Sequence, residues 1–248
     1  MSPSTQSREN RAFASEIKFV TSPRLAEQIR DWARARLSPD PNGAGGQGDT
    51  YCISSLYFDT SRFDVFHRQG SYGRSKFRIR RYGSAEVLFL ERKLKTRGLV
   101  TKRRSIVPRD EVERLAVDEL DRDWAGFWFH RRLLRRRLRP VCQISYRRTA
   151  RVAMTAYGPI RLTLDENIRA LPADEFSFSD EAGGLILENQ TVIEMKFLRF
   201  LPAAFKNLAE EFALNPRPFS KYRQAAASLH LVNVDAPNFP QPMILEYA

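Results

Sequence analysis

The sequence predicts an α+β protein built on a closed, antiparallel, eight-stranded β-barrel with a basic polar lumen and helices packed outside. Three observations predict this fold class. Most apolar segments alternate charged and aliphatic residues with the period of two that is typical of strands. Other segments carry an apolar stripe at helical spacing. The charged strand residues are mostly basic, and the chain of 248 residues has a net charge of +12.

The N-terminal part of the chain predicts a strand, a helix and a loop. Residues 14–20 alternate as a strand does. Residues 22–37 have a proline just inside their start and an apolar stripe of period 3.6, which predicts a helix. The Pro/Gly-rich segment 38–49 predicts a loop, and it lacks the Lys-Ser/Thr pair that a P-loop requires.

The rest of the chain predicts more strands, followed by helices. Further strands are expected at 51–59, 75–83, 86–95, 99–107, 141–154, 160–170 and 187–198, and helices at 61–69, within 109–139, at 202–214 and at 220–231. Residues 172–187 are expected to form a hairpin or an irregular loop. We therefore expect one domain at 13–232, preceded by a loose segment 1–12 and followed by a Pro-rich tail 233–248.

Barrel closure follows from the chemistry of the two strand faces. Cations on neighbouring strands repel one another, so a basic face is tolerated best where an anion neutralises it. The helices need the aliphatic face to cover their apolar stripes, which leaves the charged face inside if the sheet closes. A barrel of about eight strands encloses room for one small ligand. The alternative is an antiparallel sheet whose charged face is simply solvated.

A Glu-x-Lys pattern occurs on three of the predicted strands. It is written "SEIKF" at Glu16, "FLERKLK" at Glu91 and "VIEMKF" at Glu194. Each glutamate shares a strand face with the lysine two residues later. The plain interpretation of one copy is an ion pair on a solvated strand. Three copies on strands with aliphatic opposite faces favour a shared internal site.

Composition favours an anionic partner and an intracellular setting. Arginines outnumber lysines 33 to 8, and arginine clamps phosphate oxygens with two hydrogen bonds. This favours polyphosphate, nucleotide, nucleic acid or an acidic membrane surface. Nucleic acid is the less favoured partner, because the aromatic residues form no identifiable stacking platform. The N-terminus lacks the apolar core of a signal peptide and no apolar run approaches a membrane span, so we expect a cytoplasmic protein, with a peripheral place at the inner face of a membrane left open.

Several short motifs together resemble the VTC domain, the polyphosphate polymerase domain of the vacuolar transporter chaperone complex, within the triphosphate tunnel metalloenzyme (CYTH-like) superfamily. These motifs are the Glu16/Lys18 and Glu194/Lys196 pairs, "YFDT" at 57–60, "KFRIRRY" at 76–82, "SYRRTA" at 145–150, "RLTLDENI" at 161–168 and "PFSKYRQ" at 218–224. The resemblance covers about residues 13–232. It implies an eight-stranded antiparallel β-tunnel that transfers the terminal phosphate of ATP onto inorganic polyphosphate, with a divalent cation, Mn²⁺ or Mg²⁺.

The resemblance also implies roles for individual residues. The catalytic basic residues would be Lys18, Arg78, Arg80, Lys93, Lys102, Arg148, Arg161 and Lys221. The residues that line the phosphate site would be Arg104, Tyr146, Lys196 and Ser220. Glu194 would hold the metal together with Glu16, although the chemistry of Glu16 and Glu91 equally allows them to position a water or a neighbouring lysine.

One departure from the wider superfamily bears on the reaction. Many of its hydrolases begin with Glu-x-Glu-x-Lys, whereas this chain has Ala14 at the first position. The missing carboxylate favours polymerisation over hydrolysis. The alternatives are a tunnel-type hydrolase of triphosphate, polyphosphate or nucleoside triphosphate, and a non-catalytic binder of polyphosphate or nucleotide. Coupling to transport would need a membrane protein partner.

The arginine-rich segment 131–139 lies outside the resemblance motifs. Its six arginines on a predicted helix fit a solvated helix face. They equally fit a track for an exiting polyanion, or a contact with nucleic acid or an acidic membrane.

Overall fold

The computed structural model describes residues 15–41, 48–96, 99–198 and 200–233. In this part of the chain, one antiparallel sheet forms the centre of the molecule. Its eight main strands lie in the order β1-β10-β8-β7-β3-β4-β5-β6, and two short strands, β2 and β9, pair with β7 and β8. The α+β, antiparallel character predicted from the sequence is thereby confirmed.

The strands are β1 (Ser15–Thr21), β2 (Ser38–Pro39), β3 (Thr50–Asp59), β4 (Ser75–Tyr82), β5 (Val87–Thr96), β6 (Leu99–Pro108), β7 (Arg139–Thr155), β8 (Gly158–Pro172), β9 (Gly184–Leu185) and β10 (Thr191–Phe197). The α-helices are α1 (Pro23–Arg36), α2 (Phe127–Arg136), α3 (Ala203–Glu211) and α4 (Lys221–Ser228), and the 3₁₀ helices are η1 (Gly70–Arg74) and η2 (Asp110–Ala116). The predicted strands all form, with ends that differ by a few residues. No helix of the described residues is long and apolar enough to cross a membrane.

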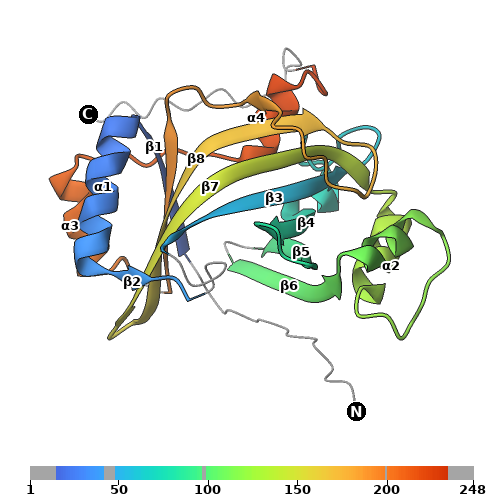
Figure 1. The fold of residues 1–248 in the computed structure, drawn as a ribbon, viewed down its shortest axis with the longest axis horizontal. Coiled ribbons are helices and arrows are strands. Elements are labelled where there is room, and N and C mark those ends of the chain that lie inside the picture. Colours follow the sequence, from blue (N-terminus) through green and yellow to red (C-terminus); the bar gives the residue numbers. More distant parts are fainter. Residues whose placement is uncertain (1–14, 42–47, 97–98, 199, 234–248) are drawn as a thin grey trace.

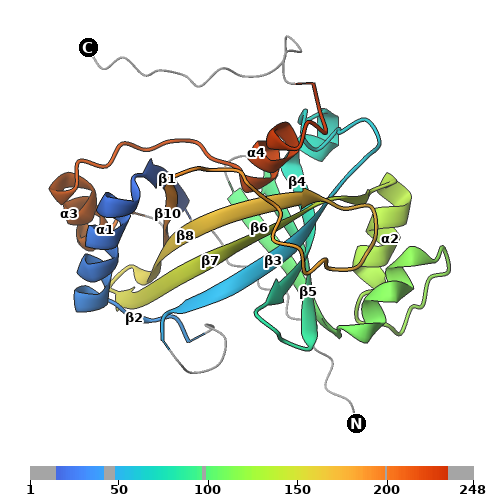
Figure 2. The ribbon, with the colours of Figure 1, turned by 45° about the horizontal axis from the view of Figure 1, so that its top comes forward.

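Helices cover the aliphatic face of the sheet at two ends. The helices α1 and α3 pack together against β1, β10 and β8, around Ile29, Ile193 and Phe205. At the other end α2 packs near β5 and β6 through Trp128 and Phe129 (Figures 1 and 2). Burial of these large side chains stabilises the layers, because each removes apolar surface from water.

The start of α1 follows the sequence signals closely. Ser22 is the N-cap, and its hydroxyl accepts from the backbone N–H of Leu25. Pro23 follows at the first helical position. A backbone N–H at this position has no intrahelical acceptor, so proline, which lacks the N–H, loses no hydrogen bond there.

The helix predicted at 61–69 is wrong. The buried carboxylate of Asp59 instead accepts from the backbone N–H groups of Thr60, Val65 and Phe66 at 2.7–2.9 Å. These bonds hold the chain in a series of turns, and Phe63 has a left-handed backbone. A local side-chain acceptor has outcompeted the helical ladder for these donors.

The helical region predicted at 109–139 is confirmed only in part. It divides into η2, a connecting segment and α2, and β7 already begins at Arg139. The break occurs where the Trp124 indole lies over Gly126, so closely that a Cβ on this glycine would come within 2.4 Å of the ring. The packing of that ring against the backbone, rather than helix propensity, sets where α2 begins.

Of the predicted closed barrel, the structure shows the antiparallel sheet of eight main strands but no closure by backbone pairing among the described residues. The strand path ends at β1 and β6, and no backbone pairing joins these two strands in the part of the chain that the structure describes. The ends of the sheet nevertheless approach each other through side chains, as the charged face shows.

Candidate functional site

One face of the sheet gathers a dense group of acidic and basic side chains; we call it the charged face. Its polar side chains alternate with the aliphatic residues that the helices cover. The charged face is formed by Glu16 and Lys18 (β1), Glu194 and Lys196 (β10), Arg161 and Asp165 (β8), Tyr146 and Arg148 (β7), Lys76, Arg78 and Arg80 (β4), Glu91 and Lys93 (β5), and Lys102 and Arg104 (β6).

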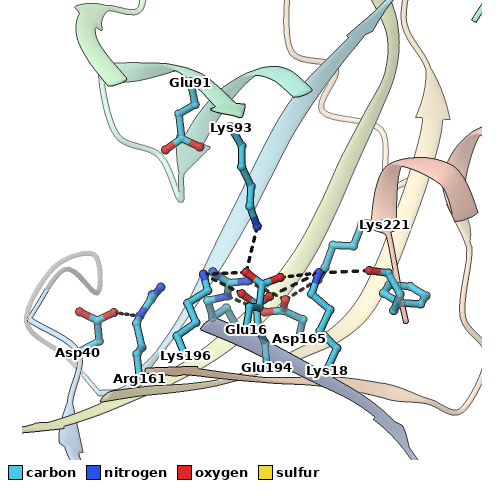
Figure 3. A network of polar contacts seen from close by, with 12 residues as sticks. Glu16, Lys18, Asp40, Glu91, Lys93, Arg161, Asp165, Glu194, Lys196 and Lys221 are labelled. Carbon is cyan, nitrogen blue, oxygen red and sulfur yellow. Dashed lines mark hydrogen bonds and ion pairs between the residues drawn. The ribbon is translucent and has the colours of Figure 1, made fainter. Parts of the chain in front are cut away.

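The charged face is concave. Lys93 on β5 donates to Glu16 on β1 at 3.0 Å, although six steps of the strand order separate these strands. A flat sheet would place them more than 20 Å apart, since neighbouring strands are about 4.8 Å apart. The sheet must therefore curl toward its charged face, and Figure 3 shows the side chain of Lys93 extending toward Glu16.

Two carboxylates and two lysines form a compact box on β1 and β10. Lys18 lies 2.9 Å from Glu16 and 3.9 Å from Glu194, and Lys196 lies 2.7 Å from Glu194 and 4.0 Å from Glu16. Burial would raise the pKa of Glu194, but Lys196 and Lys18 outweigh it and hold that pKa well below its usual value. The Glu-x-Lys pattern thus places two acids side by side, and Lys18 and Lys196 each contact both of them (Figure 3).

Glu91 is the centre of a second cluster. It is 1% exposed and contacts Arg78 and Lys102 at 2.7 Å and Arg104 at 2.6 Å, with Arg80 at 4.0 Å. Burial opposes its ionisation, but these cations hold its pKa well below the usual value. For Lys102 burial prevails over Glu91 and lowers its pKa to about 8.

Asp165 anchors a third cluster from β8. It is fully buried and accepts two hydrogen bonds from Arg148, at 2.6 and 2.7 Å, and one from Lys221 at 2.5 Å. The fork-to-fork geometry fixes the guanidinium plane of Arg148. Burial is outweighed by Arg148 and Lys221, which lower the pKa of Asp165.

The start of α4 lies against the charged face. Lys221 reaches Asp165, the backbone carbonyl of Phe219 accepts from Lys18 at 3.2 Å, and Ser220 accepts from Lys76 at 2.8 Å. Lys76 is held among other cations and contacts no carboxylate within the described residues. Burial, with Lys18 and Lys93 nearby, lowers its pKa to about 7.

Two arginines on this face are held by neutral or peripheral groups. Arg80 is buried and donates to Ser55 at 3.2 Å and to the phenol of Tyr146 at 3.1 Å. Arg161 contacts Asp40 at 2.6 Å and Tyr51 at 3.0 Å.

The predicted site residues are brought together, and their roles remain proposals. The basic residues, the phosphate-lining residues and the two metal-site glutamates that the sequence pointed to all lie on the charged face or at the start of α4. Ala14 lies outside the described residues. Asp165, Asp40 and Lys76 were not predicted as site residues, although period-two spacing puts Asp165 on the strand face of Arg161 and Lys76 on that of Arg78.

A divalent metal fits the donor set of the Glu16–Glu194 box. Mg²⁺ and Mn²⁺ take oxygen ligands, and Mg²⁺ is commonly bound by one or two carboxylates with the remaining positions filled by water and substrate phosphates. Glu16 and Glu194 supply two carboxylates. Among the described residues there is no group of three or more His, Cys, Asp or Glu side chains that could hold a metal by itself, so phosphate oxygens would have to complete the shell.

Comparison with known proteins agrees with this geometry. The sequence matches the VTC domain family over residues 13–230. No curated protein matches it. A solved structure of a candidate adenylate cyclase from Bacillus halodurans has a similar fold, with a TM-score of 0.50 at 15% identity, covering 83% of this chain and 92% of that one.

Two other solved structures give lower scores. One is a candidate adenylyl cyclase from Hippeastrum with a dominant triphosphatase activity, with a TM-score of 0.48 at 16% identity, covering 89% of this chain and 95% of that one. The other is a protein from Pyrococcus horikoshii, with a TM-score of 0.47 at 13% identity, covering 88% and 99%.

Proposed function

Because the chain belongs to the VTC domain family, we propose that it is a metal-dependent polyphosphate polymerase, which transfers the terminal phosphate of ATP onto a growing inorganic polyphosphate chain. A phosphate- or triphosphate-related activity follows from the family. The direction of the reaction, the nucleotide and the metal are the parts that we propose.

The observation that carries the proposal is the charge imbalance on the concave face. Among the residues whose side chains the structure describes, eleven basic groups lie there against five carboxylates. The basic residues are Lys18, Lys76, Arg78, Arg80, Lys93, Lys102, Arg104, Arg148, Arg161, Lys196 and Lys221, and the acids are Glu16, Asp40, Glu91, Asp165 and Glu194. A bound triphosphate supplies several negative charges in one compact ligand and neutralises this excess.

The internal acids set which cations remain available to phosphate. Glu91 holds Arg78, Lys102 and Arg104 in fixed positions, and Asp165 does the same for Arg148. Guanidinium groups oriented in advance need little reorganisation when charge develops on the transferred phosphoryl group. Arg80 donates to neutral hydroxyls and lies 4.0 Å from its nearest carboxylate among the described residues, Glu91, so its positive charge is less closely compensated than that of Arg78, Arg104 or Arg148.

We further propose that the curled sheet encloses a tunnel. The Lys93–Glu16 contact draws β5 toward β1, and the start of α4 lies against the charged face through Phe219, Ser220 and Lys221. A partly enclosed face excludes water, which strengthens each charge–phosphate contact.

The metal would be held by Glu194 and Glu16. When bound there, it would supply positive charge that offsets part of the negative charge of the phosphate groups. Lys18 and Lys196 already contact both carboxylates, so these lysines are placed to move onto phosphate oxygens when a cation takes up the carboxylates.

The reaction direction is proposed from a residue in the sequence. Ala14 stands where many tunnel hydrolases carry a further glutamate. An added carboxylate helps to hold the metal that activates water, and it repels an anionic chain end acting as nucleophile. We expect Ala14→Glu to shift the products from polyphosphate toward free phosphate. Equal ratios of polyphosphate to free phosphate in the wild type and in Ala14→Glu would show that residue 14 does not set the direction of the reaction.

The decisive experiment is incubation of the purified chain with ATP and Mn²⁺ or Mg²⁺, followed by gel separation of polyphosphate and assay of free phosphate. Long polyphosphate supports the proposal. Free phosphate alone makes the protein a hydrolase, and no turnover with retained ATP or triphosphate binding makes it a binder. Glu210→Gln, at an exposed ion pair on α3, is the matched control for carboxylate substitutions on the charged face.

A further inference from the structure

A group of arginines lies on the opposite side of the sheet from the charged face. Arg92 follows Glu91 on β5, so its side chain emerges on the face that α2 covers. Arg132 and Arg136 are four residues apart and therefore share a face of α2. Partial burial of Arg92, followed by the charges of Arg132 and Arg136, lowers the pKa of Arg92. We call Arg92, Arg132 and Arg136 the outer arginine cluster.

The outer arginine cluster lacks an acid. Within the residues that the structure describes, no carboxylate forms an ion pair with any of its three members. Arg136 donates to the hydroxyl of Ser71 and lies over the ring of Tyr72 at 4.5 Å, which are both neutral partners. The Nε–H of Arg92 is buried without an acceptor.

This arrangement differs from the cationic groups on the charged face. There, buried lysines can lose a proton to relieve repulsion, whereas an arginine stays protonated in proteins. A bound counter-ion relieves the repulsion between neighbouring guanidinium groups.

The helix dipole explains only part of the cluster. Basic residues are favourable in the last turn of a helix, which accounts for Arg135 and Arg136. It does not account for Arg92, which lies on a strand, or for its unpaired Nε–H.

We propose that the outer arginine cluster is a second anion site, which binds a free, compact phosphoanion such as tripolyphosphate between β5 and α2. Guanidinium groups match the geometry of phosphate oxygens with paired N–H donors. Arg92 is half-buried beside α2, so a slim phosphate chain would reach it more readily than a flat membrane surface, which meets the exposed arginines of α2. The site is separate from the charged face and does not depend on which reaction occurs there.

The test is calorimetric titration of the whole chain with tripolyphosphate. Arg92→Gln/Arg132→Gln removes two charges from the cluster. The control Arg131→Gln/Arg135→Gln removes two charges from exposed positions on the same helix. We expect two binding events in the wild type and in the control, and at least a tenfold loss of affinity in the second event of the cluster variant. Two unchanged events in the cluster variant, or an equal loss in the control, overturn the proposal.

Further arms separate the remaining explanations. Arg92→Lys/Arg132→Lys keeps the charge and removes the planar fork, so it should weaken the second event even if the glutamine variant does not fold. The wild type could instead show a single binding event. Loss of that event in the cluster variant supports the outer site and argues against triphosphate binding on the charged face. Persistence of that event in the cluster variant overturns the outer site. Co-sedimentation with phosphatidylserine vesicles should not distinguish the cluster variant from its control. If the cluster variant loses vesicle binding while its control keeps it, and tripolyphosphate binding is unchanged in both, the proposal is also overturned.

Discussion

Glu91→Gln removes the one negative charge that holds four cations together on the charged face. The substitution keeps the shape of the side chain and leaves Arg78, Arg104 and Lys102 buried around a neutral amide, with Arg80 beside them. Loss of one partner from a buried ion pair costs about 3–5 kcal/mol of unfolding free energy, because the remaining charge is uncompensated. For a chain of this size each kcal/mol lowers Tm by about 2–4 °C, so we expect Tm to fall by roughly 6–20 °C.

The assay is thermal unfolding followed by circular dichroism, with and without tripolyphosphate. The ligand should raise Tm more in Glu91→Gln than in the wild type, since it supplies the negative charge that the cluster has lost. Glu210→Gln, whose exposed pair with Lys206 is worth at most about 1 kcal/mol, is the control. A Glu91→Gln protein that melts with the wild type, or that gains no more from tripolyphosphate than the control does, would falsify the central role of Glu91.

Three further predictions concern single groups. Glu194→Gln should retain the fold and lose Mn²⁺ binding measured calorimetrically in the presence of tripolyphosphate; unchanged Mn²⁺ affinity would reject Glu194 as a metal ligand. Lys76 has its pKa lowered to about 7, so its charge is lost as pH rises through 7 and the affinity of the wild type for tripolyphosphate should fall faster between pH 6 and 9 than that of Lys76→Arg, which stays protonated. The titration of tripolyphosphate itself affects both proteins equally. Parallel pH profiles of affinity for the wild type and Lys76→Arg would therefore contradict this prediction. Tyr222→Phe removes a donor from buried Asp59 and should cost about 1–3 kcal/mol in denaturant unfolding, whereas exposed Tyr157→Phe should not; equal stabilities would show that Asp59 does not need this bond.

The sequence by itself determined which residues share a face. Side chains on a strand alternate with period two whatever the strand pairs with. Glu16 and Lys18, Glu194 and Lys196, and Arg78 and Arg80 could therefore be assigned to one charged face before any contact was known. The amphipathic stripe of α1 and its Ser22–Pro23 start are equally local, and they too could be predicted.

Helix predictions from periodicity were wrong where a nearby side chain that is not part of the periodic pattern binds backbone groups or packs against them. The segment after Asp59 forms turns because one buried carboxylate takes three backbone N–H groups, and α2 begins late because the Trp124 ring lies on Gly126. Neither the burial of Asp59 nor the position of the Trp124 ring can be predicted from the helical or strand periodicity of the sequence.

Only the tertiary structure decided which acid neutralises which base. Lys93 meets Glu16 across the curl of the sheet, rather than the glutamate two residues before it. Asp165 receives Lys221 from a helix 56 residues later. Lys76, on the same strand face as Arg78, contacts no carboxylate in the described part of the chain, and its pKa is lowered to about 7. These pairings depend on sheet curvature and on where α4 docks, because Coulomb interactions act over distances in space and not along the chain.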